Sequence, residues 1–195
     1  PSQLKQVLAK QWSENWSASF EFFDMRCIAA ASIGQVHRAQ LTDGRNLAIK
    51  VQYPGVARSI DSDVQNIGVL IKLSGLLPKG FELAPYLREV RDQLHDETNY
   101  AIEATHLKRF QTLLADTPHF TVPSIHEDWS TPSILAMEYV EGISIEGVAA
   151  LSQEERDQVA KHLIVLMLRE LFEFGVMQTD PNFANYRYQP DTCRI

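Results

Sequence analysis

The fold of this chain is decided by the stretch AAASIGQVHRAQLTDGRNLAIKVQYPG, which runs from Ala29 to Gly55. Its centre is a hairpin, in which two predicted strands over residues 35–41 and 46–52 are joined by the sequence TDGR at 42–45. Asp-Gly supplies the positive-φ backbone conformations that tight hairpin turns require. The small residues ahead of the hairpin predict a tight turn, and the sequence YPG ends the second strand.

The small residues ahead of the hairpin also have the spacing of a nucleotide-phosphate loop. A protein kinase covers ATP phosphates with G-x-G-x-x-G-x-V on a strand–turn–strand, and places a lysine on the next strand in V-A-I-K. Ala29, Ala31, Gly34 and Val36 fall on the three glycines and the valine, and Lys50 ends the sequence LAIK. For the loop alone, a small-residue turn without a ligand is the alternative. The lysine on the following strand favours the phosphate loop.

A second motif lies near the carboxyl end, where QTDPNFAN holds Asp180 and Asn185 after a predicted helix that closes at Gly175. The catalytic loop of a protein kinase has the same separation of aspartate and asparagine. There the aspartate accepts a proton from the attacking group or orients it, and the asparagine offers a carbonyl oxygen to Mg²⁺. An Asp-Pro turn capped by asparagines is the alternative. The phosphate loop and Lys50, in the same order, favour the catalytic interpretation.

A kinase also needs a helical glutamate that holds the lysine against the α- and β-phosphates. The helix predicted over residues 85–115 contains HDETNYAIEA, in which small residues surround Glu103 as a buried contact requires. Asn99 lies four residues earlier on the same helix face, whereas Glu97 points elsewhere unless the helix bends. A solvated charged face is the alternative for any single glutamate of this helix.

The rest of the pattern predicts the order of elements around these motifs. Further helices are expected over 2–17, from Val56 to about 75, and after a capping box formed by Ser152 and Glu155. Further strands are expected over 26–30, 121–129 and 133–140. This order predicts an α+β, protein-kinase-like fold. Residues 1–140 would form an antiparallel β N-lobe with inserted long helices, and 141–195 the beginning of a helical C-lobe with the catalytic loop.

Composition and charge exclude several classes of function. The formal net charge of −7 argues against a nucleic-acid backbone as the main partner, which requires a basic face. The longest apolar run, LIVLML at 163–168, is far shorter than a membrane span. Cys27 and Cys193 lack metal or redox spacing, which favours a reduced, cytosol-facing compartment. The final sequence YRYQPDTCRI has the pattern of a hairpin cut in its second strand, so the chain is expected to be a fragment.

Together these residues resemble the UbiB-type atypical kinases, the aarF-domain family linked to ubiquinone biosynthesis. The resemblance is carried by IAAASIGQVHRAQL, LAIKVQYPGVARSIDSDVQNI, ETNYAIEA and FEFGVMQTDPNFANYRY, and it covers nearly the whole chain. In that family an alanine-rich loop replaces the glycine-rich one. A Cβ at Ala29 and Ala31 restricts positive φ and close approach of the backbone to phosphate. The loop is therefore expected to hold nucleotide differently from a protein kinase, which makes protein substrates less favoured.

The resemblance implies a site for ATP or ADP with Mg²⁺. In this site Lys50 would contact the phosphates, Glu103 would be its ion-pair partner, and Asp180 would be the catalytic-loop aspartate. The implied phosphate loop comprises Ala29, Ala30, Ala31, Ser32, Gly34 and Val36. The implied hinge beside adenine comprises Met137 as gatekeeper, Glu138 and Val140, and the implied Mg²⁺ ligands are Asn185, Glu97 and Asn99.

The sequence departs from the family pattern in three places. The paired-acid motif Glu-x-Asp reads Glu97-Thr98-Asn99, so one carboxylate is an amide that brings no charge for a metal or a proton. A Lys-x-Gly-Gln helix motif is absent from the amino end, and the chain stops at Ile195, ahead of the Asp-Phe-Gly motif. We therefore expect these 195 residues alone to be catalytically inactive.

The predicted function is that of an ATP-binding atypical kinase or ATPase of UbiB type that supports lipid-quinone biosynthesis. A non-catalytic nucleotide-sensing scaffold of a biosynthetic complex is the first alternative, and a helical interaction module without nucleotide is the second. The expected partners are nucleotide and either lipid-quinone intermediates or a biosynthetic protein complex, with no nucleic acid and no transmembrane segment in this chain. The expected location is cytoplasmic and peripheral at the inner membrane.

Overall fold

The structure is a computed structural model that describes residues 2–78, 80–179 and 182–195. The chain divides into two compact units. The first unit holds Pro1–His106 and Ile125–Glu138, and the second holds Leu107–Ser124 and Tyr139–Ile195. The division expected from the sequence, at residue 140, therefore differs from this partition mainly in segment 107–124.

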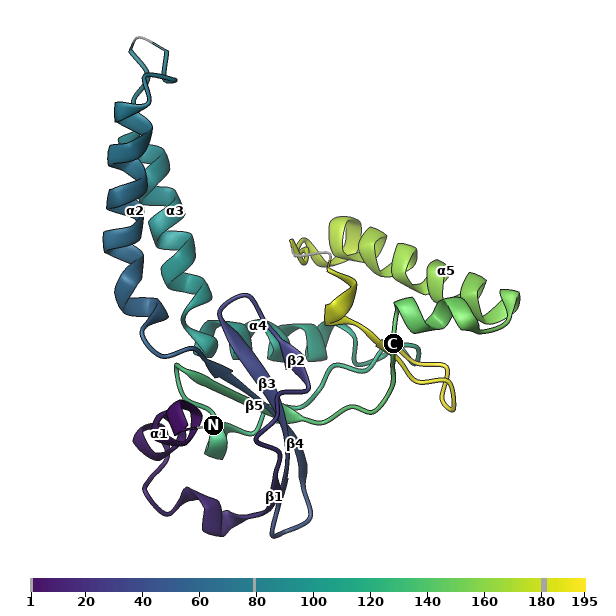
Figure 1. Ribbon diagram of the computed structural model, residues 1–195. Helices are drawn as coiled ribbons and strands as arrows, with labels where there is room; N and C mark the ends of the chain where they lie inside the picture. Colours follow the sequence, from purple (N-terminus) through teal and green to yellow (C-terminus); the bar gives the residue numbers. More distant parts are fainter. Residues whose placement is uncertain (1, 79, 180–181) are drawn as a thin grey trace. The chain divides into compact units, whose positions relative to one another are not determined.

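An antiparallel sheet with the order β1–β3–β4–β5 forms the centre of the first unit, and β2 also pairs with β3 (Figure 1). Its strands are β1 (Phe20–Phe23), β2 (Ala29–Ala30), β3 (Gly34–Leu41), β4 (Asn46–Gln52) and β5 (Ile134–Glu138). The β3–β4 turn contains Gly44 with a φ of 91°, as the Asp-Gly turn predicts. The central hairpin is therefore confirmed, with β4 at the predicted residues.

The two faces of the sheet have different surroundings. Leu47, Ile49 and Val51 of β4 are at most 1% exposed and belong to the main hydrophobic cluster of this unit. They alternate with Ala48 and Lys50, which are partly exposed. Because successive side chains of a strand point to opposite faces, burial of the first three turns Lys50 to the face away from that cluster.

Helix α1 (Ser2–Gln11) and the 3₁₀ turn η1 (Trp16–Ser19) contribute to the same hydrophobic cluster as the core face of the sheet. The helix predicted over 2–17 ends at Gln11, because the aromatic residues after it turn inward. The indole Nε1 of Trp12 donates to the backbone oxygen of Trp129 at 3.0 Å, and their ring centroids are 5.0 Å apart. Strand β1, with the sequence FEFF, was not predicted, and it continues this aromatic cluster along the edge of β3.

Two predicted strands are wrong in extent. The strand expected over 26–30 is reduced to β2, because the side chain of Asp24 accepts a hydrogen bond from the backbone N–H of Arg26 and forms a turn there. The strand expected over 121–129 is replaced by an isolated bridge between Ile125 and Met137, followed by a 3₁₀ turn, η2 (Glu127–Trp129). Pro123 has no N–H for a strand ladder, which disfavours regular pairing there.

The single helix predicted over 85–115 is also wrong. The structure contains α3 (Ala84–Glu97) and α4 (Tyr100–Leu113), which are separated at Thr98 and Asn99. The hydroxyl of Thr98 donates to the backbone oxygen of His95 at 2.9 Å, and the side-chain oxygen of Asn99 accepts from the N–H of Ala101 at 3.1 Å. Such local bonds offer the backbone an alternative to continued helix, and Asn is a preferred helix N-cap.

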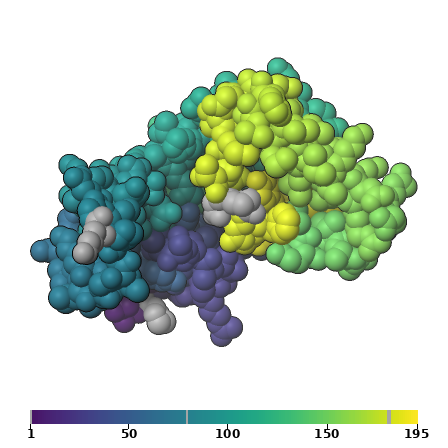
Figure 2. Space-filling model, turned by 90° about the horizontal axis from the view of Figure 1, so that it is seen from above, coloured from purple at the N-terminus to yellow at the C-terminus, as the bar shows by residue number. Residues whose placement is uncertain are grey.

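Helix α2 (Val56–Leu73) lies side by side with α3 as an antiparallel pair (Figure 1; its surface is in blue to teal in Figure 2). Three leucines are exposed where α2 ends and the chain turns toward α3. Leu70, Leu73 and Leu76 are 65%, 78% and 85% exposed. Within residues 2–78, 80–179 and 182–195, none of the helices combines the length and the apolar character that crossing a membrane requires.

The second unit is built around α5 (Gln153–Arg169), which begins at the predicted capping box. Both reciprocal bonds between Ser152 and Glu155 are present, so this prediction is confirmed. A π-helical turn, η4 (Glu170–Phe174), leads to Gly175. The rest of the unit includes β6 (Ile143–Ser144) paired with β7 (Arg187–Tyr188), and the 3₁₀ turns η3 (Glu146–Ala150) and η5 (Phe183–Asn185).

His37 of β3 is a buried titratable side chain of the first unit. It is 1% exposed, and its Nδ1 lies 2.8 Å from the backbone oxygen of Asp24, which can only accept a hydrogen bond. Nδ1 therefore carries the proton, and within the described part of the chain Nε2 has no partner. Burial lowers the pKa of His37 below 6.5.

We expect the free energy of unfolding to fall as the pH drops below 6.5, because the unfolded chain takes up the His37 proton before the folded one does. The substitution His37→Leu should flatten this dependence between about pH 7 and pH 5, as measured by chemical denaturation. His106→Gln, at an exposed histidine, is the matched control and should leave the slope unchanged. An unchanged slope in His37→Leu would contradict the assignment.

Candidate functional site

The register of the sheet places Lys50 in one row of paired residues with β2, the strand that begins the predicted phosphate loop (called the loop strand below). Ala29 is paired with Val36, Val36 with Lys50, and Lys50 with Leu135. Residues directly opposite each other on paired strands share a face of the sheet. These side chains therefore lie on the face away from the main hydrophobic cluster, and this face is the candidate site.

The residues between β2 and β3 form a tight hairpin. The N–H of Ala31 donates to the oxygen of Gly34 at 2.8 Å, and the N–H of Gly34 donates back at 3.5 Å, so Ser32 and Ile33 form the tip. Across the described residues, Cys193 is the only non-glycine with a positive φ. The alanines of the loop are therefore in ordinary backbone conformations, and the hairpin does not need the positive φ that favours glycine.

Gly34 is required for a different reason, which is space. A Cβ built on Gly34 would lie 2.5 Å from the backbone oxygen of Val51 and 2.7 Å from the hydroxyl oxygen of Tyr100. The first of these atoms belongs to the sheet and the second to the start of α4. The glycine of the predicted loop therefore lets β3 pack closely against both.

Lys50 and Glu103 form the ion pair that the sequence predicts. The ammonium of Lys50 donates to both carboxylate oxygens of Glu103, each at 2.8 Å, although 53 positions separate the two residues. The side chains are 19% and 38% exposed. Hydrogen bonds between charged groups are shorter and stronger than neutral ones, so the pair fixes where the ammonium lies. Partial exposure screens the attraction, so its contribution to overall stability is small.

Helix α4 is held over the site face by contacts that the sequence pattern did not indicate. The N–H of Tyr100 donates to the backbone oxygen of Pro132 at 2.9 Å. The side-chain amide of Gln52, two residues after Lys50 on the same face of β4, donates to the backbone oxygen of Thr98. These bonds join the α3–α4 junction to β4 and to the segment before β5. Gln52 is 7% exposed, and a buried polar side chain needs such a hydrogen-bond partner. In the sequence, the only signal was a polar residue at the end of an apolar strand.

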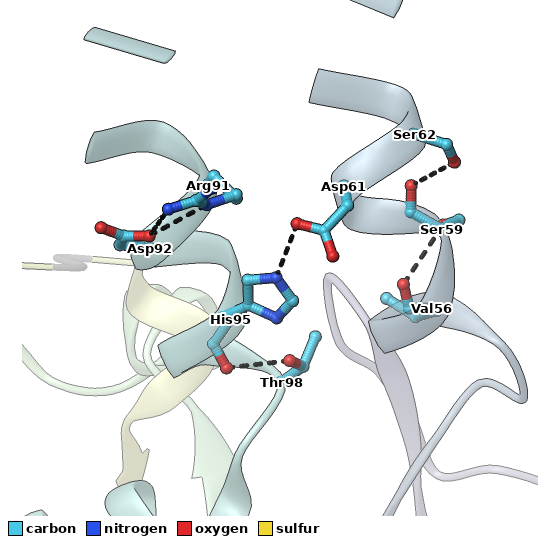
Figure 3. Close-up of polar contacts among 8 residues, drawn as sticks. All are labelled: Val56, Ser59, Asp61, Ser62, Arg91, Asp92, His95 and Thr98. Carbon is cyan, nitrogen blue, oxygen red and sulfur yellow. Dashed lines mark hydrogen bonds and ion pairs between the residues drawn. The ribbon is translucent and has the colours of Figure 1, made fainter. Parts of the chain in front are cut away.

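The same junction is tied to the helical pair at its other side (Figure 3). His95 Nε2 lies 3.2 Å from Asp61 Oδ1 of α2, and the backbone oxygen of His95 accepts the hydroxyl of Thr98. Both side chains of the His95–Asp61 contact are more than two fifths exposed. The contact therefore joins the start of α2 to the end of α3, and it adds little to the free energy of unfolding.

The predicted metal ligands of the first unit lie around the break between the helices. Glu97 is exposed at the end of α3, and Asn99 is half-buried with its side-chain oxygen engaged by the N–H of Ala101. The oxygen of Asn99 thus has a structural use as a helix cap, which an aspartate would serve equally well. Within the described residues there is no group of three or more His, Cys, Asp and Glu side chains that could hold a metal ion. The metal roles of Glu97 and Asn99 stay predictions.

The predicted hinge begins in β5. Met137 is paired with Ala48 and Glu138 with Leu47, so Met137 lies on the same face as Lys50, two residues along β4. Val140 follows β5 and belongs to the second unit. The gatekeeper role of Met137 and the adenine contacts of Glu138 and Val140 stay predictions.

The predicted catalytic loop belongs to the second unit, and Asp180 lies outside the described residues. Asn185 ends η5 and is exposed, while Asn182 caps this turn by accepting the N–H of Ala184 at 3.0 Å. One asparagine of the segment thus has the capping role that the alternative interpretation proposed.

The segment ahead of the predicted catalytic loop is held by a buried carboxyl group. Glu170 is 4% exposed and accepts the N–H of Gln178 at 3.2 Å. Burial raises the pKa of Glu170, and the bond from Gln178 opposes this shift. The hydroxyl of Tyr186 donates to the side-chain oxygen of Gln178 at 2.5 Å, which joins the residues on either side of the loop.

The whole chain, residues 1–195, matches the ABC1 atypical kinase-like domain, and the chain belongs to this family. Atypical kinase COQ8, mitochondrial, of Saccharomyces cerevisiae is 42% identical over 193 residues, which cover 99% of this chain and 38% of the yeast protein. Atypical kinase COQ8B, mitochondrial, of Rattus norvegicus is also 42% identical over 193 residues, with coverage of 99% and 37%. The chain thus spans less than two fifths of the length of these relatives.

A solved structure is similar over nearly the same extent. The complex of Rv3197 with erythromycin from Mycobacterium tuberculosis matches with a TM-score of 0.83 at 29% identity, covering 98% of this chain and 49% of that one. The predicted kinase-like α+β fold and the resemblance to atypical kinases are therefore confirmed. The names of the yeast and rat relatives place those proteins in mitochondria.

We expect Gly34→Ala to destabilise the first unit by about 1–3 kcal/mol, the usual effect of an extra methyl group in a packed site. The measurement is the free energy of unfolding by chemical denaturation. Gly147→Ala is the matched control, because a Cβ at Gly147 meets nothing closer than 3.5 Å. Adding Tyr100→Phe to Gly34→Ala should restore part of the loss, since it removes one of the two obstructing atoms. A neutral effect of Gly34→Ala would show that the hairpin is not packed this closely.

Proposed function

We propose that this chain carries the nucleotide-binding part of an ATP-dependent atypical kinase or ATPase. The observation that carries the proposal is the Lys50–Glu103 ion pair, in which both carboxylate oxygens lie 2.8 Å from the ammonium. The pair lies on the site face of the sheet, in the row that includes the loop strand β2, in a chain of an atypical kinase family. A lysine held in this way presents a fixed positive charge to the α- and β-phosphates.

The loop and the hinge would bind the rest of the nucleotide. Residues 29–34, with Val36 behind them, would cover the phosphates, and the backbone groups of Glu138 and Val140 would face adenine beside Met137. The hairpin bonds between Ala31 and Gly34 support a preformed loop, because they order its backbone through bonds within the chain.

The remaining predicted residues would perform the transfer. Asp180 would accept the proton of a hydroxyl group or water, whose oxygen forms a bond to the γ-phosphorus as the bond to the ADP oxygen breaks. Mg²⁺ would neutralise charge on the phosphates, and it usually takes only one or two protein ligands beside them. Asn185 supplies an exposed amide oxygen of the type this hard ion prefers, with Glu97 and Asn99 as the further predicted ligands.

In the whole protein, we infer from the resemblance to the ubiquinone-linked family that this activity supports lipid-quinone biosynthesis at a membrane surface. The similarity to COQ8 and COQ8B, which are named as atypical kinases, supports a phosphotransferase-like enzyme.

Nucleotide binding is tested by thermal unfolding of the full-length protein with and without Mg-ATP and Mg-ADP. Nucleotide at a hundred times its dissociation constant should stabilise the protein by about 2.7 kcal/mol. Lys50→Ala should abolish the shift and Glu103→Gln should reduce it, because the ammonium then loses its anchor. Lys72→Ala, at an exposed lysine of α2, is the control and should retain the full shift. The absence of any shift in the unsubstituted protein would overturn the nucleotide site.

Turnover is tested separately by phosphate release from ATP. Asp180→Asn in the full-length protein should lower the rate by about 10²- to 10⁴-fold, the usual contribution of a general base, while the nucleotide-dependent thermal shift persists. Asp191→Asn, at an exposed aspartate of the following turn, should leave the rate unchanged. Full activity of Asp180→Asn would contradict the catalytic role.

A further inference from the structure

Tyr100 is a buried residue at the centre of the candidate site that the sequence motifs did not single out. It is 1% exposed and is the first residue of α4, where its N–H is bonded to the oxygen of Pro132. Its backbone is therefore fixed to the segment that leads into β5, and its side chain points back between β3 and β4, toward Gly34 and Lys50.

The ring of Tyr100 lies beneath the ammonium of Lys50. The Nζ atom is 4.8 Å from the ring centroid, within the distance at which the negative π face of an aromatic ring attracts a cation. Glu103 lies three residues after Tyr100, so the two side chains share a face of α4. One turn of helix thus supplies both the carboxylate and the ring that contact the same ammonium.

The hydroxyl group of Tyr100 does not explain why a tyrosine occupies this position. It is buried, and among the described residues it has no hydrogen-bond partner. Burial raises the pKa of this phenol well above its usual value, and the charge of Glu103 adds to the effect, so the side chain stays neutral. The hydroxyl oxygen does occupy space beside Gly34, 2.7 Å from where a Cβ would lie. The ring is therefore the part that acts on Lys50, and the hydroxyl fills the space behind the loop.

We propose that Tyr100 is the positioning residue of this nucleotide site: its ring holds the ammonium of Lys50 in one place, while its hydroxyl only fills the space beside Gly34. The proposal rests on the nucleotide-binding function proposed above. It differs from a simple packing role because it requires the electron-rich face of the ring, and not only its volume. Its first test needs no nucleotide.

The first test is an NMR measurement on the ligand-free full-length protein with isotope-labelled lysine. The ε-methylene signal of Lys50, assigned by its loss in Lys50→Arg, should be shifted by the ring current of Tyr100 relative to the exposed lysines. Tyr100→Phe should retain the shift, and Tyr100→Leu should remove it. A Lys50 signal that is the same in the unsubstituted protein and in Tyr100→Leu would overturn the contact.

The second test separates the charge distribution of the ring from its shape. Phenylalanine and its progressively fluorinated analogues are placed at position 100, since fluorine weakens the π face with little change in volume. The affinity for Mg-ADP should fall stepwise along the series, by roughly 2- to 30-fold in total, the range expected for a cation–π contact. The melting temperature without nucleotide should change little. In a Lys50→Met background, residual affinity should no longer depend on fluorination.

The outcomes of this series are distinct. A flat affinity along it, with binding that still depends on Lys50, would mean that Tyr100 only packs and would overturn the proposal. If no protein in the series binds Mg-ADP, the proposed function fails, and the ring-current measurement alone decides whether Tyr100 holds Lys50. Tyr100→Phe with the affinity of the unsubstituted protein would support the assignment to the ring, because it lacks only the hydroxyl.

Discussion

The alternation of side chains along β4 is the constraint on which the rest of the site depends. Leu47, Ile49 and Val51 must be buried in the core of the first unit. Because a strand presents successive side chains to opposite faces, their burial turns Lys50 away from the core and into the row that includes Val36 and the loop strand. A slip of one residue in the pairing of β3 with β4 would bury the charge and expose the core. The hydrophobic effect on one face thus places the chemistry on the other.

The second requirement is a partner for the charge of Lys50. Glu103 of α4 is that partner, and the break between α3 and α4 lets this helix begin beside the sheet. Capping by Asn99 starts a new helix at Tyr100, and contacts to Pro132 and Gln52 hold this helix start against the sheet. The helical pair α2–α3 therefore lies between Lys50 and Glu103 in the chain, while the two side chains remain in contact. The polar residues at 98–99 therefore have a clear structural use beside any role in metal binding.

The loop between β2 and β3 shows how alanines can occupy positions where a protein kinase has glycines. Its backbone is a short hairpin with ordinary φ values, so Ala29 and Ala31 cause no conformational strain. The requirement for glycine persists only at Gly34, and its cause is the close approach of Val51 and Tyr100. Gly34 is therefore the residue of this loop that lies next to the buried tyrosine.

The sequence was enough to predict the β3–β4 hairpin, the capping box of α5 and the kinase-like family, because these depend on local turn chemistry, on alternation, or on motifs with defined spacing. The resemblance to that family implied the pairing of Lys50 with Glu103, and the structure shows the two side chains in contact. The structure was needed to show that β1 joins the sheet, that the start of α4 is bonded to the segment before β5, and that Tyr100 lies beneath Lys50. Those features depend on contacts between residues distant in the chain, such as Tyr100 with Pro132 and with Lys50, which no local pattern records. The break between α3 and α4 has both kinds of cause, because Thr98 and Asn99 form local bonds there and Gln52 and Pro132 hold the junction from a distance.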